Sequence, residues 1–115
     1  MISIIIPTLN EERILETTLK KLRAGLRATA SEIIVSDGQS SDRTAEIAKK
    51  YANRVVIWNK KRRQTIAGGR NFGAAAAKGD YLVFLDADVF IPDPDNFFPK
   101  AIAFFEKNPR LVGLT

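Results

Sequence analysis

The chain has 115 residues, of which 45% are apolar, and this is enough to fill the core of one ordinary domain. It contains no cysteine and no histidine, which excludes disulfides, thiolate chemistry and the usual zinc ligand. Any metal must then be held by oxygen, which favours Mg²⁺ or Mn²⁺. The formal net charge of +5 suits anionic partners such as phosphates, nucleic acid or an anionic membrane.

No apolar stretch approaches the roughly 18 residues needed to span a bilayer. The first apolar run stops at Pro7, too early for a secretory signal. We therefore expect a soluble segment in the cytoplasm.

Five short apolar runs, rich in β-branched residues, predict buried strands. They lie at residues 3–6, 32–36, 55–58, 81–85 and 111–114.

Helical patterns separate these runs. Asn10 is expected to cap the first helix, with Glu11 and Glu12 in its first turn and a leucine stripe behind them. The other helices are expected to start near 40–42, to span 67–77 and to span about 96–107.

The densest basic run, residues 60–63, precedes the third helix and consists of two lysines and two arginines. A solvated loop and a phosphate-facing loop are equally compatible with it. No aromatic residue is interleaved in the run, as a base-stacking groove would require, so nucleic acid is not the expected partner.

Strands that alternate with helices predict an α/β fold, a Rossmann-like, mainly parallel sheet with helices on both faces. Ligands of such sheets bind beyond the carboxyl ends of the strands. Polar, acidic segments follow the first, second and fourth strands, at residues 7–11, 37–42 and 86–88. If these strands are close in the sheet, the three segments converge on one crevice.

Asp86 and Asp88 follow the fourth strand directly. In extended backbone, residues i and i+2 point to the same side, so both carboxylates can face one cation while Ala87 points away. Their mutual repulsion would be offset by a cation with its diphosphate. The alternative is a pair of solvated turn aspartates.

Asp37 and Arg70 are two further candidates. Asp37 ends the second strand, where its carboxylate is expected either to accept a base or ribose hydrogen bond or to form an Asx turn. Arg70 lies early in the third helix, from which its planar guanidinium is expected to reach phosphate oxygens. The neighbouring glycines match neither a dinucleotide fingerprint nor a P-loop.

Three segments, SIIIPTLNEE, EIIVSDGQSSDRT and GGRNFGAAAAKGDYLVFLDADV, together resemble the family 2 glycosyltransferases of the GT-A fold in order and approximate spacing. The resemblance covers nearly the whole chain. It implies metal-dependent binding of a UDP-, GDP- or dTDP-linked sugar, with Mn²⁺ or Mg²⁺, and transfer with inversion at the anomeric carbon. The sugar, the base and the lipid or saccharide acceptor are not specified.

The resemblance implies a role for each matching residue. It places Asp37 on the base, Arg70 near the diphosphate, and Asp86 and Asp88 at the donor and metal site. The residues expected around the nucleotide are Pro7, Thr8, Asn10 and Glu11. Family members often have Asp-Asp where this chain has Ser36-Asp37, so only Asp37 is transferred.

The chain is shorter than members of this family, which have a second half that binds the acceptor and supplies the catalytic base. We therefore expect residues 1–115 to be the donor-binding domain of a longer protein, without a catalytic base of its own. A full-length protein with membrane helices would lie at the cytoplasmic face of a membrane.

Two other functions fit parts of the sequence. Asp86-Ala87-Asp88-Val89 also matches the local pattern of a phosphatase of the haloacid dehalogenase type, although that pattern normally follows the first strand of its domain. The other alternative is a nucleotide-binding module without turnover.

Overall fold

The computed structural model describes residues 1–108, 110 and 113. Within them the chain forms one four-stranded sheet, in which every strand pair is parallel. The strands are β1 (Ile2–Thr8), β2 (Ser31–Asp37), β3 (Arg54–Ile57) and β4 (Tyr81–Phe84), in the order β3-β2-β1-β4. The predicted α/β class is confirmed. Of the fifth predicted strand, at 111–114, only residue 113 is described.

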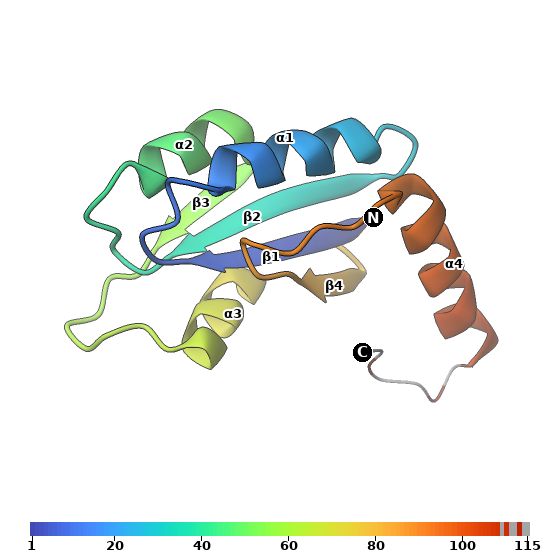
Figure 1. Cartoon of the computed structure of the whole chain (residues 1–115). Coiled ribbons are helices and arrows are strands. Elements are labelled where there is room, and N and C mark those ends of the chain that lie inside the picture. The colour runs from blue at the N-terminus through green and yellow to red at the C-terminus, as the bar shows by residue number, and fades with distance from the viewer. Residues whose placement is uncertain (109, 111–112, 114–115) are drawn as a thin grey trace.

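Helices lie on both faces of the sheet (Figure 1). α1 and α2 lie on one face, α3 lies on the opposite face, and α4 stands near the N-terminus. The helices are α1 (Leu15–Gly25), α2 (Thr44–Tyr51), α3 (Ile66–Ala74) and α4 (Pro94–Lys107).

The main core lies between β1, β2 and the first two helices. Alternate residues of β1 point to this side and pack against the leucine stripe of α1, because side chains alternate across a strand and recur every three to four residues on a helix. The buried members from these two elements are Ile2, Ile4, Ile6, Leu15, Leu19 and Leu22. The sequence pattern predicted this stripe correctly.

Two glycines let α3 lie close to the other face. A Cβ added to Gly73 would come within 2.5 Å of Ile5 Cγ2, and one added to Gly69 would come within 3.2 Å of Pro7 Cβ. Any side chain at these positions would therefore push the helix off the sheet. These glycines serve helix packing, and they bring Arg70 close to the strand ends.

The start of α1 differs from the prediction. Asn10 is not the N-cap, because α1 begins at Leu15 after Ile14, which makes no side-chain cap. Asn10 has a φ of 54°, a left-handed conformation that asparagine tolerates better than most residues. Its carboxamide accepts a hydrogen bond from the backbone N–H of Ser41, at 2.9 Å. It thus joins two loops instead of capping a helix.

The other helix boundaries shift by a few residues. α2 begins at Thr44, whose N–H donates to Asp42 Oδ1 at 2.9 Å. α3 ends at Ala74, short of the predicted Ala77. α4 begins at Pro94, since proline has no N–H to lose in a first turn and its φ is already helical.

Among the described residues, no helix is both long enough and apolar enough to cross a membrane.

Candidate functional site

The sheet order brings the three polar segments together. β1 lies between β2 and β4, so the carboxyl ends of the first, second and fourth strands are neighbours. The register aligns Thr8 with Asp37 and Ile5 with Phe84. The expectation that these strands lie close to one another is therefore confirmed.

Hydrogen bonds lock the loop after β1 to the loop after β2. The backbone N–H of Asn10 donates to Ser40 Oγ at 2.9 Å, and that of Glu11 donates to Thr44 Oγ1 at 2.8 Å. Together with the bond between Ser41 and Asn10, they fix the backbone of both loops before any ligand arrives.

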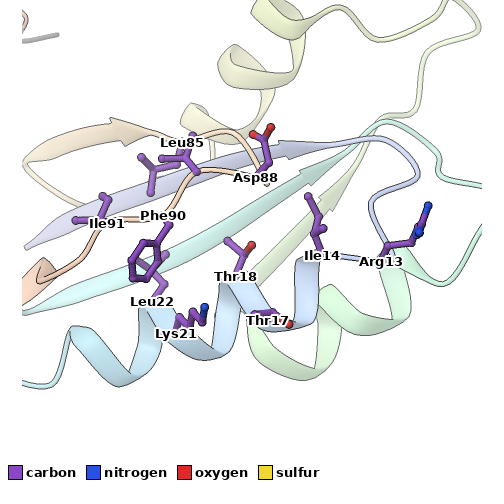
Figure 2. Close-up of a pocket in the computed structure, with 11 residues that line it drawn as sticks. Arg13, Ile14, Thr17, Thr18, Lys21, Leu22, Leu85, Asp88, Phe90 and Ile91 are labelled. Carbon is purple, nitrogen blue, oxygen red and sulfur yellow. The ribbon is translucent and has the colours of Figure 1, made fainter.

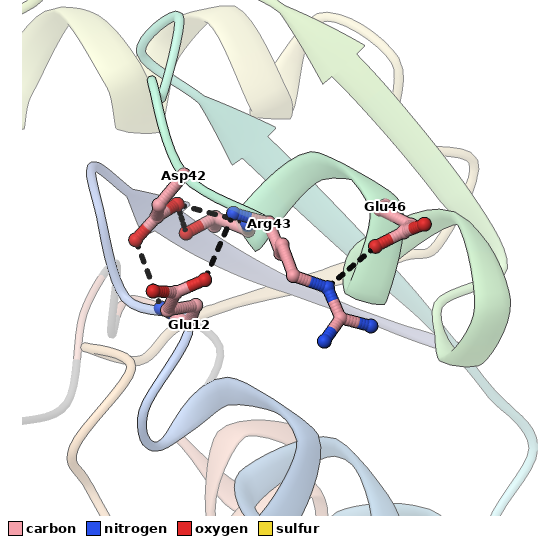
Figure 3. A network of polar contacts seen from close by, with 5 residues as sticks. Glu12, Asp42, Arg43 and Glu46 are labelled. Carbon is pink, nitrogen blue, oxygen red and sulfur yellow. Dashed lines mark hydrogen bonds and ion pairs between the residues drawn. The ribbon is translucent and has the colours of Figure 1, made fainter.

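A second set of contacts closes the same junction from outside (Figure 3). Arg43 donates its backbone N–H to Glu12 Oε2 at 3.1 Å and its Nε to Glu46 Oε2 at 2.8 Å. Asp42 accepts from the backbone N–H of Glu12 at 3.4 Å. All of these side chains are partly or fully exposed, so their effect is to order the loops more than to stabilise the core.

Asp37 lies inside the loop junction, with only 1% of its surface exposed. Its Oδ1 accepts from the hydroxyls of Thr8 at 2.8 Å and Ser40 at 2.6 Å, and its Oδ2 accepts from the backbone N–H of Ser40 at 2.9 Å. The carboxylate thus orders the turn after β2, as in the structural alternative, although its backbone partner lies three residues on and not two as in an Asx turn. In this conformation, Oδ2 retains the greater capacity to accept a further hydrogen bond.

Asp86 and Asp88 follow β4 as an exposed pair, while Ala87 between them is 3% exposed. The exposure pattern agrees with the prediction, but the segment lies beyond β4 and forms a turn instead of extended backbone. The carbonyl of Ala87 accepts a hydrogen bond from the hydroxyl of Thr18 in α1, at 2.6 Å. The backbone N–H of Val89 donates to the Asp86 carbonyl at 3.0 Å and closes a turn. The pair thus stands on a turn attached to α1.

Glu11 shows how closely the acidic groups approach one another. Burial raises the pKa of its carboxyl group above the ordinary value of 4.5, and the negative charges of Asp88, Asp42 and Asp86 raise the pKa further. Groups from three loops therefore share one electrostatic environment. Like charges held together in this way are typical of a cation site.

Arg70 is the basic group nearest to the pair. Its Nη2 lies 3.6 Å from Asp86 Oδ1, and its guanidinium carbon lies 5.9 Å from the centre of the Phe84 ring. Its Nε is buried and has no hydrogen-bond partner among the described residues. Arg70 therefore lies beside the carboxylate pair, and its contact with phosphate oxygens stays a prediction.

Asp86 and Asp88 supply oxygen ligands, which Mg²⁺ and Mn²⁺ prefer, and both side chains are accessible from solvent. The described residues contain no group of three or more histidine, cysteine or acidic side chains arranged to enclose a metal. The residues fit a cation that takes its remaining ligands from water or phosphate.

A cavity of about 290 Å³ lies beside this turn, between α1 and residues 85–91 (Figure 2). Its walls are mostly apolar and include Leu22, Leu85 and Phe90. In Figure 2 the carboxylate of Asp88 points away from Leu22 and Phe90. Asp88 is nevertheless one of the residues that line the cavity, so the cavity borders the carboxylate pair.

The sequence predictions missed three supporting residues. Thr18 holds the Asp86–Asp88 turn, while Ser40 and Thr44 order the loops around Asp37 and Glu11. Each acts through a partner far along the chain, such as Ala87 for Thr18. Hydroxyl residues in or beside helices give no local signal for such contacts.

Known proteins share both the sequence pattern and the fold. The dolichol-phosphate mannosyltransferase of Pyrococcus furiosus is 35% identical over 105 residues, which are 88% of this chain and 29% of that protein. The structure of Staphylococcus aureus TarS with UDP-GlcNAc superposes with a TM-score of 0.75 at 26% identity, over 92% of this chain and 31% of the other.

A third similar protein is glucosyl-3-phosphoglycerate synthase of Mycobacterium tuberculosis, solved with Mn²⁺, UDP and glucosyl-3-phosphoglycerate. Its TM-score is 0.70 at 29% identity, over 90% of this chain and 38% of the other. The chain thus spans about a third of the length of each of these relatives.

The sequence model described as glycosyl transferase family 2 matches residues 3–115. This match leaves the phosphatase alternative without support, since Asp86 and Asp88 follow the fourth strand of the sheet and not the first. The chain belongs to glycosyl transferase family 2.

Proposed function

We propose that this chain is the donor-binding part of an inverting glycosyltransferase and binds the diphosphate of a nucleotide sugar through a divalent cation at Asp86 and Asp88. One observation carries the proposal. Two exposed carboxylates share the carboxyl edge of a parallel sheet with Glu11, whose pKa they raise, and with Arg70 at 3.6 Å from Asp86. A cation with its diphosphate satisfies all of these groups.

The similar proteins support the same ligand class. TarS was solved with UDP-GlcNAc, and the mycobacterial synthase was solved with UDP and Mn²⁺. The cation would be Mn²⁺ or Mg²⁺, and the donor a UDP-, GDP- or dTDP-linked sugar. The acceptor is a lipid or a saccharide, and a longer parent protein at the cytoplasmic face of a membrane is part of the proposal.

Each residue has a role in this mechanism. The bound cation would stabilise the charge that develops on the departing nucleoside diphosphate. Arg70 directs charged N–H donors at the same phosphates. Asp37 recognises the base by accepting a hydrogen bond at Oδ2. Thr8 and Ser40 hold the Asp37 side chain in place. Pro7, Thr8, Asn10 and Glu11 form the wall on the β1 side.

We assign none of the described residues to the deprotonation of an acceptor, because Glu11, Asp37 and Asp42 belong in this proposal to the nucleotide side. Histidine is absent, Asp86 and Asp88 hold the cation, and Asp37 is buried in hydrogen bonds. We assign the catalytic base to a part of the parent protein outside this chain.

The test is calorimetric titration of UDP, GDP and dTDP with Mn²⁺, with Mg²⁺ and with EDTA. Binding of one of them is expected only with a cation, and Asp88→Asn should weaken it at least tenfold. Lys49→Gln, on the exposed surface of α2, is the control and should bind normally. Unchanged affinity in EDTA, or unchanged affinity of Asp88→Asn, would disprove the metal assignment.

A further inference from the structure

The loop between β3 and α3, residues 58–65, has an unusual concentration of charge. It contains four basic residues and no acidic one, and so accounts for most of the net charge of +5. The four side chains are exposed, and none of the ion pairs among the described residues involves them. They are Lys60, Lys61, Arg62 and Arg63. We refer to residues 58–65 as the basic loop.

The basic loop is built on Trp58, which is 5% exposed. The indole N–H donates to the carbonyl of Arg62 at 2.8 Å, and the Trp58 ring meets Phe72 of α3 edge-on with centroids 5.4 Å apart. Lys60 Nζ and Arg62 Cζ lie 5.6 and 5.8 Å from the ring centre. The loop therefore has an anchored base from which its charges project.

The buried position of Trp58 bears on whether the loop binds nucleic acid or an anionic membrane. Binding of single-stranded nucleic acid relies on aromatic rings that stack on bases. Trp58 is the only aromatic residue in the loop, and it is buried beneath the cationic side chains. The loop offers positive charge without a stacking surface, which disfavours nucleic acid.

Ile66 adds an apolar group beside the charges. It follows the loop as the first residue of α3, and 68% of its surface is exposed, the largest fraction among the exposed large apolar side chains described. Basic residues next to an exposed aliphatic side chain are typical of surfaces that dock on anionic membranes. The charges meet lipid headgroups while the apolar group enters the interface.

The basic loop borders the proposed nucleotide site, because Gln39 Nε2 donates to the Trp58 carbonyl and Gln64 lies beside Gly38. The start of the loop is nevertheless distant from the carboxylate pair. It follows β3 at one edge of the sheet, whereas Asp86 and Asp88 follow β4 at the opposite edge. Three strand spacings amount to about 14 Å. Figure 1 shows the connection from β3 to α3 extending beyond the carboxyl end of the sheet. A diphosphate held by Asp86 and Asp88 would leave the tip of the loop exposed.

We infer that the basic loop docks this chain on the surface of an anionic phospholipid bilayer. Its lysines and arginines contact the headgroups, and Ile66 inserts into the interfacial region. Docking there sets the carboxyl edge of the sheet, with its crevice, next to the lipid surface. The inference concerns the four exposed charges of a loop that borders the proposed donor site, and the vesicle experiment without nucleotide tests it separately from nucleotide binding.

The experiment is sedimentation of the chain with vesicles of phosphatidylcholine alone or with 30% phosphatidylserine, about the anionic content needed for a clear surface potential. Binding is expected with phosphatidylserine only and should fall as salt rises. The variant Lys60→Glu/Lys61→Glu should lower the partition coefficient at least tenfold. Ile66→Ser should lower it severalfold and leave its salt dependence unchanged.

The matched control is Lys49→Glu/Lys50→Glu, which reverses the same charge on the exposed surface of α2. It should bind within threefold of the unmodified chain. Circular dichroism on all variants verifies the fold. Equal binding to both vesicle types, or equal binding of the two charge-reversed variants, would overturn the inference. So would displacement from vesicles by UDP or GDP with Mn²⁺, or by a single-stranded oligonucleotide, since the loop would then bind that ligand.

Discussion

At the scale of single residues, the local environment of Arg70 predicts a selective defect. Its guanidinium lies beside Asp86, and its Nε has no hydrogen-bond partner among the described residues. Arg70→Ala should therefore weaken nucleoside diphosphate binding about 10- to 100-fold, the range expected for charged hydrogen bonds. Binding of the nucleoside alone should change little, because it has no phosphate for Arg70 to contact.

Calorimetry with UDP and uridine, or the preferred pair, measures this difference. Arg27→Ala is a suitable control, since Arg27 is exposed in the connection from α1 to β2, at the amino end of the sheet. An equal loss for nucleoside and diphosphate would mean that Arg70 only supports the local structure.

Ionised Glu11 is expected to lower the stability of the folded chain. Burial, and then the charges of Asp88, Asp42 and Asp86, raise its pKa, so the folded chain holds this proton more tightly than the unfolded chain does. Ionisation of Glu11 therefore lowers stability once the pH rises above its ordinary value of 4.5. At pH 7 in EDTA, Glu11→Gln should melt about 2 °C or more above the unmodified chain.

Thermal unfolding at pH 7 and pH 4 checks the prediction for Glu11. The difference should shrink at pH 4, where the carboxyl group is protonated in both folded and unfolded chains. It should also shrink with Mn²⁺ at pH 7, because a nearby cation offsets the repulsion. A variant less stable than the unmodified chain in EDTA would contradict this account.

At the scale of elements, Glu32 of β2 contacts both neighbouring strands, β1 through Ser3 and β3 through Arg54. Ser3 Oγ and the backbone N–H of Lys78 donate to Glu32 Oε2 at 2.6 and 2.7 Å, and Arg54 Nε lies 3.5 Å from Oε1. Burial alone would raise the pKa of this carboxyl group. The two hydrogen bonds and the charge of Arg54 outweigh that effect, and the pKa is lowered.

A lowered pKa means that ionised Glu32 stabilises the fold above its ordinary value of 4.5, and that this contribution is lost as the pH falls through the lower folded value. Glu32→Gln should therefore lower the free energy of unfolding by about 1–3 kcal/mol at pH 7. The deficit should be much smaller at pH 3. Urea titrations at both pH values measure it, and a deficit independent of pH would exclude the ionised carboxylate as its cause.

The elements themselves were largely predictable from the sequence, for a physical reason. Strands buried on both faces are continuous apolar runs, and the stripe from Leu15 to Leu22 has helical spacing, so each is specified locally. Asn10 was assigned wrongly because an acidic turn after an asparagine resembles a helix start. Its left-handed conformation depends on Ser41, 31 positions later.

The candidate site was predictable only in part. The exposure of Asp86 and Asp88 on either side of the buried Ala87 agrees with the sequence pattern, but β4 ends at Phe84 and these residues lie in a turn, not in extended backbone. The burial of Asp37 arises from Thr8 and Ser40, which meet only when two loops pack together. No spacing along the chain specifies such a contact.

At the scale of the whole molecule, the proposed roles are unevenly filled. The proposal gives the chain a cation site, a phosphate-binding arginine and a base contact, but assigns none of the described residues as the base for an acceptor. We expect it to bind a donor nucleotide without transferring the sugar at an enzymatic rate. A missing general base lowers rates on the order of 10²- to 10⁴-fold, and a missing acceptor site removes positioning as well.

The measurement is incubation with labelled donor sugars, Mn²⁺ and a panel of lipid and saccharide acceptors. Slow hydrolysis of the donor is compatible with the prediction, because water needs no dedicated pocket. Saturable transfer to any acceptor would show that these residues contain a complete active site.

The central position of β1 also affects how the chain is made. β1 can pair with β2 once the first 37 residues are made. Its other edge stays unpaired until β4 is made, whose Tyr81 aligns with Ile2. About 70 residues separate the two strands, so at about 5–20 residues per second the ribosome needs roughly 4–15 s to deliver the second partner. Throughout that interval a row of isoleucines has an unpaired edge open to other nascent chains. We therefore expect chaperones to protect this edge during synthesis, because the first strand lies in the middle of the sheet.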